Sequence, residues 1–342
     1  MLDQATVVLL IAVLVVLVIA YAVGRILKRQ PEGAIDPALV KTFNRRVKAW
    51  LIIYLILALG IILGRIACVV LFGVVSFWAL REFITMTPTR RADHRALFWT
   101  FFLFTPLQYV FVGFGSSYYD ANTGEGFDFY GLYTLMIPVY ASLVIPARIA
   151  FSDDQKRFLE RSAKIQFALL VCVYALSHAP AILDLQLLAW NAETGTYELW
   201  TKAGEYKQAG LLIYFVAIVQ LSEVAQYVWD RLLGRHVVAP AINATKSWEG
   251  LFGGILTTAV FGVLLWLTGV TPFTWYGSAL MAMVIAIMGF NGTITMSAIK
   301  RDRGVQDYGT LVQGHAGVLD RIDAMCFSAP LFFHLTRFFL GA

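Results

Sequence analysis

The chain of 342 residues is 59% hydrophobic, and only 14% of its residues are charged. A soluble globular protein carries about a quarter charged residues, so the composition excludes that class and indicates a membrane protein. The net charge of +5 at pH 7 therefore points to anionic lipid headgroups and to membrane topology, and we expect no nucleic-acid partner. The three cysteines lie far apart in apolar runs, with neither a disulfide framework nor a zinc-site spacing.

Ten apolar stretches follow one another along the chain, and a bilayer span needs about 20 such residues. They cover about 5–24, 49–63, 66–80, 96–115, 130–149, 165–190, 209–229, 250–270, 273–292 and 324–341. Only Gly64 and Arg65 separate the second and third, which are short, so we expect a tight helical hairpin there. The predicted fold class is all-α, a polytopic integral membrane protein with about ten transmembrane helices.

The distribution of basic residues predicts the orientation of these spans. If the N-terminus lies outside, all but four of the 27 Lys and Arg residues fall in inner loops or at inner helix ends. The four on the outer side are Arg65, Lys202, Lys207 and Arg337. Because positive charge is enriched on the cytoplasmic side, we expect an outer N-terminus and cytoplasmic loops around 230–248 and 297–323. In a bacterium the membrane would be the inner one.

Two polar segments of the second half are candidates for chemistry. Segment 297–323 lies between two apolar stretches and holds Lys, Arg, Asp and His side chains. Ionisable side chains close to the hydrocarbon of a membrane cost free energy, so such a cluster indicates a functional site. Before it, four residues recur at helical spacing and share one face of the seventh span: Glu223, Gln226, Tyr227 and Asp230. Lys246 and Ser247 then enter the eighth span, where the N–H groups of a helix start favour a phosphate.

Both segments resemble the phosphatidate cytidylyltransferases, the CDP-diacylglycerol synthases. The matching positions in the later segment are Ser297, Lys300, Arg301, Asp307, Gly309, Gly314, His315, Gly317, Asp320, Arg321, Ile322 and Asp323. Those in the earlier segment are Glu223, Gly234, Arg235, Pro240, Lys246, Ser247, Trp248, Glu249 and Gly250. The resemblance implies a membrane enzyme that transfers CMP from CTP to phosphatidate, with Mg²⁺ as cofactor.

The chemistry implied by this resemblance assigns roles to the polar side chains. Nucleotidyl transfer to a lipid phosphate brings two polyanions together, so catalysis rests on positioning and on neutralisation by basic groups and a divalent metal. The catalytic candidates are Lys300, Arg301, His315 and Arg321. The candidates for binding substrate phosphates are Lys246, Ser247, Ser297, Gly314 and Gly317. The carboxylates available to Mg²⁺ are Glu223, Asp307, Asp320 and Asp323.

The resemblance covers roughly 210–335, so we expect a membrane region over 1–208 and a catalytic region over 209–342. The sequence departs from the family pattern at Gln306, Gln313, Ala316, Glu223, Asp230 and 243–245. These departures indicate a divergent member and leave the lipid acceptor open. Two alternatives also stay open: a CTP-using enzyme for another lipid phosphate, including a lipid kinase, and a transporter or non-catalytic scaffold. A homodimer is not excluded.

Overall fold

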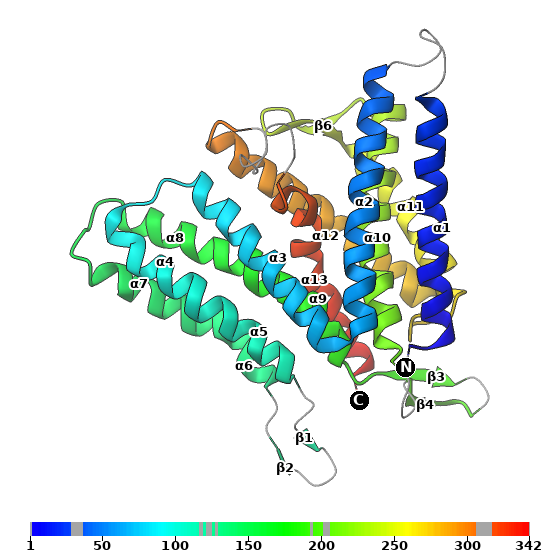
Figure 1. Cartoon of the computed structure of the whole chain (residues 1–342), viewed down its shortest axis with the longest axis horizontal. Coiled ribbons are helices and arrows are strands. Elements are labelled where there is room, and N and C mark those ends of the chain that lie inside the picture. Colours follow the sequence, from blue (N-terminus) through cyan, green and yellow to red (C-terminus); the bar gives the residue numbers. More distant parts are fainter. Residues whose placement is uncertain are drawn as a thin grey trace.

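The structure is a computed structural model of the chain, and it describes residues 2–28, 37–115, 119–120, 125–126, 129–191, 194–200, 206–305 and 317–341. These residues are mostly helical, and the only strands among them form three short hairpins (Figure 1). The predicted all-α class is therefore confirmed. The apolar composition explains this outcome, since a helix satisfies its backbone N–H and C=O groups internally where water is absent.

The described residues of the first half of the chain form nine α-helices. They are α1 (Gln4–Leu27), α2 (Pro37–Leu63), α3 (Arg65–Met86), α4 (His94–Trp99), α5 (Thr105–Phe114), α6 (Tyr130–Leu135), α7 (Ser142–Ala150), α8 (Phe158–Leu169) and α9 (Leu176–Ala181). Short π-type segments at Thr100–Phe104, Met136–Ala141 and Leu170–Ala175 join α4 to α5, α6 to α7 and α8 to α9. Each of these pairs is therefore one helical rod. The predicted hairpin at Gly64 is confirmed: this glycine has a φ of 101° and separates α2 from α3 by one residue.

The second half is simpler, and within its described residues there are four long helices. They are α10 (Gln208–Leu233), α11 (Trp248–Trp266), α12 (Trp275–Asp302) and α13 (Leu319–Leu340). The strands of the chain are β1 (Tyr119–Asp120), β2 (Glu125–Gly126), β3 (Leu188–Asn191), β4 (Thr196–Leu199), β5 (Val237–Ala239) and β6 (Asn243–Ser247), paired antiparallel in that order.

Eight helical segments of the described chain are long and apolar enough to cross a membrane. They are Gln4–Leu27, Arg65–Met86, Arg91–Phe114, Tyr130–Ala150, Phe158–Asp184, Gln208–Leu233, Trp248–Trp266 and Trp275–Asp302. The predicted number of ten is not confirmed. The apolar part of α2, Trp50–Leu63, is shorter, and α13 is not among the eight. Charged residues border or interrupt both apolar runs: Lys48 precedes Trp50 in α2, and α13 carries Asp320, Arg321, Asp323 and Arg337.

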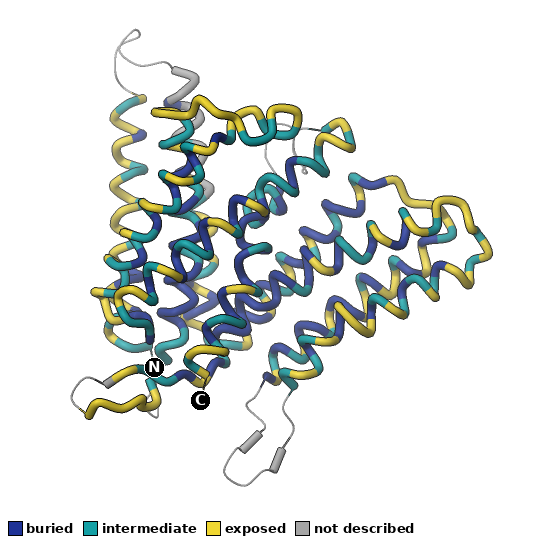
Figure 2. Tube along the Cα trace, turned by 180° about the vertical axis from the view of Figure 1, so that it is seen from behind, coloured by how far each residue is buried: buried dark blue, intermediate teal, exposed yellow. Residues whose placement is uncertain are grey.

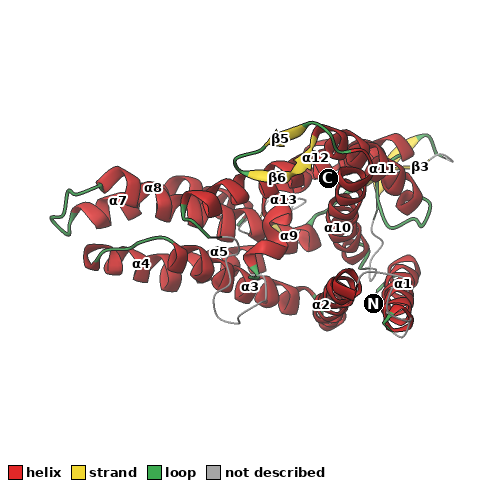
Figure 3. Cartoon of the chain, turned by 90° about the horizontal axis from the view of Figure 1, so that it is seen from above, coloured by secondary structure: helices red, strands yellow, loops and turns green. Residues whose placement is uncertain are grey.

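The helices place two sets of connections at opposite ends of the molecule. The N-terminus, the C-terminus and the hairpins β1–β2 and β3–β4 lie at one end, at the bottom of Figure 1. Hairpin β5–β6, the end of α12 and the start of α13 lie at the other end, at the top. Seen from above, α4, α5, α7 and α8 extend to one side, and α1, α2, α10 and α11 stand on the other (Figure 3).

The core follows the helices that lie between these two groups. Contacts join α3 to α9 and both of them to α13, and α12 packs along α10, α11 and α13. All six residues of α9 and ten of the 22 residues of α13 are buried, whereas α1 exposes one apolar side along its length (Figure 2). Such an exposed apolar face is typical of a helix surrounded by lipid. The start of α13, with its acidic residues, is therefore held inside the bundle.

Candidate functional site

The polar residues predicted from the sequence gather at the end of the bundle where α12, α13 and hairpin β5–β6 meet (Figure 1). Helix α12 continues ten residues beyond the predicted end of its span, to Asp302. Lys300 and Arg301 therefore lie on its last turn, where cations favour the negative end of the helix dipole. The sequence placed both residues in a loop, and this expectation was wrong because the helix extends past the apolar stretch.

Lys300 pairs with Asp320 across the gap between α12 and α13. The Lys300 Nζ lies 2.7 Å from Asp320 Oδ1, and the side chains are only 15% and 8% exposed. The backbone N–H of Gly317 donates to the second oxygen, Asp320 Oδ2, at 3.2 Å. Three of the predicted site residues thus meet in one arrangement. Both oxygens of the Asp320 carboxylate are engaged by protein donors.

Asp323 lies one turn further into α13 and is 6% exposed. Its Oδ1 accepts the backbone N–H of Ala324 at 2.7 Å, and no other donor of the described residues contacts this carboxylate. The charges that act on it come from Lys300, Asp320 and Lys246. Gly292 allows the close approach of α12, because a Cβ there would lie 2.8 Å from the carbonyl oxygen of Asp323. Asp323 therefore keeps one oxygen uncommitted beside two cations.

Three other predicted residues belong to the same parts of α12 and α13 as the Lys300–Asp320 ion pair. Ser297 Oγ accepts a hydrogen bond from Asn243 Nδ2 of β6 at 3.2 Å, and Arg301 Nε donates to the carbonyl of Ile242 at 3.2 Å. Both contacts hold the β5–β6 hairpin against the last turns of α12. Arg321 makes no side-chain hydrogen bond or ion pair with any described residue. Its five N–H donors can therefore serve an anionic ligand at no cost to an internal contact.

Lys246 and Ser247 are positioned by Asp230, at the end of α10. The Lys246 Nζ lies 3.5 Å from Asp230 Oδ2 and 3.3 Å from Gln226 Oε1. Asp230 Oδ1 accepts from the N–H of Ser247 at 2.9 Å and from its hydroxyl at 2.7 Å. Ser247 in turn caps α11, since its Oγ accepts the N–H of Gly250 at 3.0 Å. An internal carboxylate thus sits at the helix start where the sequence predicts a substrate phosphate, and phosphate binding by Ser247 stays a prediction.

The predicted polar face of α10 is confirmed for Gln226 and Asp230, which both contact Lys246. Gly253 and Gly254 of α11 allow α10 to approach closely, since a Cβ at Gly254 would lie 2.4 Å from Gln226 Cγ. Glu223 lies half-buried on the same helix, one turn before Gln226. It has interactions of its own within the chain, and its assignment as a metal ligand stays a prediction.

Two carboxylates of the site were not predicted from the sequence. Asp230 was predicted on the polar face of the seventh span and noted as a departure from the family pattern, but it was not among the predicted site residues. Glu82 of α3 is the second. Its two oxygens accept the backbone N–H groups of Val318 at 3.1 Å and Leu319 at 2.9 Å, at the start of α13. Glu82 is 6% exposed, and its sequence signal was an acidic residue just after an apolar stretch.

The carboxylates of Asp320 and Asp323 suit Mg²⁺ only if substrate oxygens and water complete its coordination. Within the described ranges, no three His, Cys, Asp or Glu side chains lie close enough to hold one metal ion together. Asp323 offers a free oxygen, and Asp320 adds a second carboxylate that is engaged by Lys300. Mg²⁺ is commonly held by one or two carboxylates together with substrate phosphates and water, and these two residues fit that mode.

Three predicted site residues cannot be placed. Asp307, Gly314 and His315 lie outside the described residues, as do the departures at Gln306, Gln313 and Ala316. The connection between α12 and α13 therefore contributes only its two ends, up to 305 and from 317, to the geometry given above.

Comparison with known proteins gives one family and two kinds of relatives. The sequence model described as the cytidylyltransferase family matches residues 44–339. An uncharacterized protein of Escherichia coli, YnbB, is 32% identical over 297 residues, which cover 86% of this chain and 87% of that protein. The phosphatidate cytidylyltransferases of Mycobacterium leprae and Staphylococcus epidermidis are 37% and 33% identical over 123 and 129 residues. These matches cover 35% and 37% of this chain, and only 38% and 50% of those two enzymes.

Proposed function

The chain belongs to the cytidylyltransferase family, and on this premise we propose that it transfers CMP from CTP to phosphatidate. The products would be CDP-diacylglycerol, an intermediate of phospholipid synthesis, and pyrophosphate. Family membership and the apolar helices already give a nucleotidyltransferase with a nucleotide substrate in a membrane environment. The lipid acceptor and the details of the reaction are the proposal.

One observation supports this function most directly: the Lys300–Asp320 pair lies next to Asp323 and the unengaged Arg321, at one end of the helix bundle. Cations and carboxylates that meet near the membrane boundary suit two phosphate-bearing substrates, one lipid and one soluble. A structural ion pair alone would not need the free donors of Arg321. Lys246, held by Asp230 and Gln226, adds a third cation on the same side.

The reaction would proceed by attack of a phosphate oxygen of the lipid on the α-phosphorus of CTP. A new P–O bond forms, the bond to the β-phosphate oxygen breaks, and pyrophosphate leaves with the electron pair. The attacking phosphate is already ionised at neutral pH, so no strong base is needed. Lys300, Arg301, Arg321 and Lys246 would hold phosphate oxygens, and Asp320 would orient Lys300.

Mg²⁺, when bound, would neutralise charge that builds up on phosphate oxygens during the transfer. Asp323 and Asp320 are the described carboxylates that would hold it, and the sequence adds Glu223 and Asp307 as candidates. The site would face the cytoplasm, where CTP is found. In support, the connections that carry most of the basic residues lie at the same end of the bundle as this site.

A CTP-consumption assay in detergent tests the proposal. Purified chain, radiolabelled CTP and Mg²⁺ are incubated with phosphatidate and with a panel of other lipid phosphates. We expect label in CDP-diacylglycerol with phosphatidate, and loss of labelled product in the Lys300→Met variant. Asp302→Asn is the matched control, because Asp302 lies on the same turn of α12, is 66% exposed and pairs with its neighbour Arg303.

The outcome separates the alternatives. Product from a different lipid phosphate would keep the enzyme class and change the acceptor. Transfer of the terminal phosphate of CTP would identify a lipid kinase. No consumption of CTP with any lipid, by a folded chain, would contradict an enzymatic function and favour a transporter or scaffold.

A further inference from the structure

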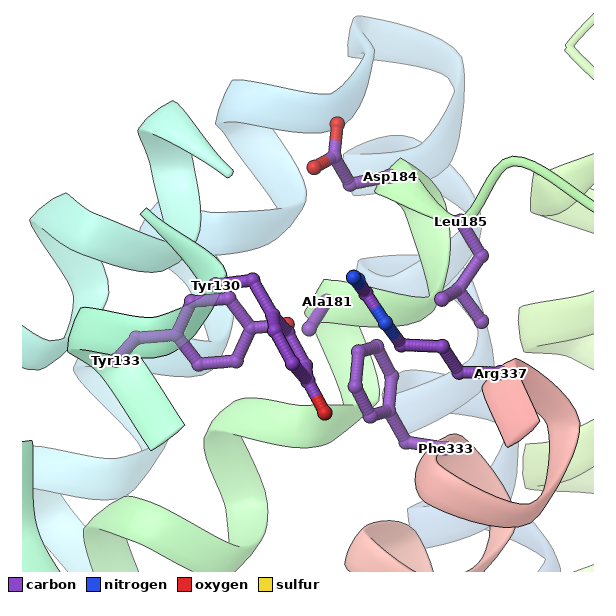
Figure 4. Close-up of a pocket in the computed structure, with 7 residues that line it drawn as sticks. All are labelled: Tyr130, Tyr133, Ala181, Asp184, Leu185, Phe333 and Arg337. Carbon is purple, nitrogen blue, oxygen red and sulfur yellow. The ribbon is translucent and has the colours of Figure 1, made fainter. Parts of the chain in front are cut away.

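A second polar site lies at the opposite end of α13, far from Lys300 and Asp320. It is a hollow of about 470 Å³ lined by Tyr130, His334, Leu335, Arg337 and Phe338. A smaller cavity of about 10 Å³ adjoins it and shares Tyr130 and Arg337 (Figure 4). Arg337 is 17 residues beyond Asp320 on one helix. At 1.5 Å per residue the two sites are about 25 Å apart.

Arg337 has no anionic partner among the described residues. Its guanidinium carbon lies 3.5 Å from the ring centroid of Tyr130, so one face of the guanidinium is stacked. The nearby acid Asp184 is paired with Arg65 at 2.6 Å, and Figure 4 shows its carboxylate turned away from Arg337. No carboxylate of the described residues lies within ion-pair distance of Arg337. Stacking uses the face of a guanidinium and leaves its in-plane N–H donors for a ligand.

Other polar atoms lie beside this cation. The Tyr130 hydroxyl is 3.3 Å from His334 Nδ1. The ring of His178 lies 4.9 Å from that of His334, and its buried Nε2 has no hydrogen-bond partner in the described part of the chain. Because His178 Nδ1 lies 2.8 Å from the carbonyl oxygen of Tyr174 and donates to it, Nε2 of the neutral ring is an acceptor. A buried acceptor without a partner costs free energy, so this position is suited to a donor such as water.

The surface around these groups is apolar and open. Phe338 is 80% exposed and the adjacent Phe339 is 70% exposed, and both lie on the last turn of α13. Exposed aromatic rings next to a tyrosine and an arginine are typical of the interface between hydrocarbon and headgroups. Since no described carboxylate pairs with Arg337, an anionic lipid headgroup can supply its counter-ion.

We propose that this hollow binds the phosphate of an anionic phospholipid, with Arg337 as the main contact and Phe338 beside the acyl chains. The site is separate from the candidate active site, and the inference does not depend on the proposed function. The lipid would neutralise Arg337 and accept a hydrogen bond at the edge of the Tyr130–His334 pair. A zwitterionic lipid would bind more weakly, because its own cation offsets the phosphate charge.

Native mass spectrometry of the detergent-purified chain tests the site with phosphatidylglycerol, phosphatidylcholine and inorganic phosphate as probes. We expect phosphatidylglycerol to bind the wild-type chain at least tenfold more tightly than it binds Arg337→Gln. Arg231→Gln is the matched control and should bind like wild type, because Arg231 also lies over a tyrosine ring, 5.8 Å from Tyr227, but at the other end of the bundle. Inorganic phosphate at millimolar concentration should not displace the lipid.

Three results would overturn the proposal. They are equal binding of phosphatidylglycerol by Arg337→Gln and wild type, equal binding of the two lipids by wild type, and displacement of the lipid by inorganic phosphate. If Arg337→Gln does not fold, Arg337→Lys decides instead, because lysine keeps the charge and loses the planar contact. That variant should still prefer phosphatidylglycerol, with reduced affinity, and the absence of any preference contradicts the site. CTP consumption by the same variants reports on the active site independently.

Discussion

Replacement of Glu82 by glutamine tests whether a helix of the first half supports the candidate active site. Glu82 lies on α3 and accepts the N–H groups of Val318 and Leu319, at 3.1 and 2.9 Å, where α13 begins. The indole N–H of Trp78 donates to the same carboxylate at 3.1 Å. A buried carboxylate at a helix N-terminus satisfies two orphan donors and interacts favourably with the helix dipole.

The expected cost follows from these contacts. Glutamine keeps one acceptor oxygen and loses the charge, so one of the two backbone N–H groups is left without an acceptor. A hydrogen bond to a charged group contributes about 1.5–3 kcal/mol, and an unsatisfied buried donor costs about 1–3 kcal/mol. We therefore expect Glu82→Gln to destabilise the chain by roughly 2–4 kcal/mol. A shift of the first turn of α13 would also displace Asp320, and misplacement by about 1 Å can lower a rate 100-fold.

The assay is CTP consumption together with thermal unfolding in detergent. Glu82→Gln should lower the melting temperature and reduce turnover at least tenfold, and Glu82→Asp should be intermediate because it keeps the charge but reaches less far. Glu160→Gln is the control, since Glu160 pairs at the surface with Lys164 at 2.6 Å and such pairs contribute about 0–1 kcal/mol. If Glu82→Gln matches this control in both measurements, Glu82 does not position α13.

Three further predictions concern topology, the carboxylates and the free cation. A cysteine introduced at Thr196 should react with a membrane-impermeant thiol reagent from outside, and one introduced at Gln155 should react only after lysis. Background labelling should be low because the three native cysteines are buried. Reaction of both introduced cysteines from the same side would contradict the predicted orientation. Asp323→Asn and Asp320→Asn should each abolish turnover with helix content unchanged, and near-normal activity at low Mg²⁺ would remove that residue from the metal site. Arg321→Gln should raise the KM for a substrate at least tenfold without loss of stability, and an unchanged KM would show that Arg321 binds no phosphate.

The helical class and the order of the long helices were predictable from the apolar runs of the sequence. Long apolar runs form helices because no other arrangement satisfies their backbone in lipid, and Gly64 marked the hairpin between α2 and α3. Helix ends were less predictable, since a helix does not stop where its apolar residues stop. Lys300 and Arg301 thus lie on α12 rather than in a loop, because the intrahelical hydrogen bonds continue into the polar boundary.

The candidate site was predictable where its members are close in sequence or share a helix face. The carboxylates of Asp320 and Asp323 share the start of α13, and Gln226 and Asp230 share a face of α10. The pairing of Lys300 with Asp320 could be guessed only as one of several combinations of opposite charges. Glu82 could not be assigned, because its partners are backbone N–H groups 236 and 237 positions away, and backbone groups carry no sequence signal.

Glu82 also bears on the division of the chain at 208/209, which is a prediction from the sequence. The residues that resemble the family signature lie after this boundary, yet α13 packs against α3 and α9 from before it. Without α3, the first N–H groups of α13 would lose their acceptor in a region where water is scarce, and the start of the helix would be free to unwind. Asp320 would then lose the geometry that brings it to Lys300. The helices before 209 therefore do more than anchor the chain in the membrane, because one of them fixes the turn that carries the two central carboxylates.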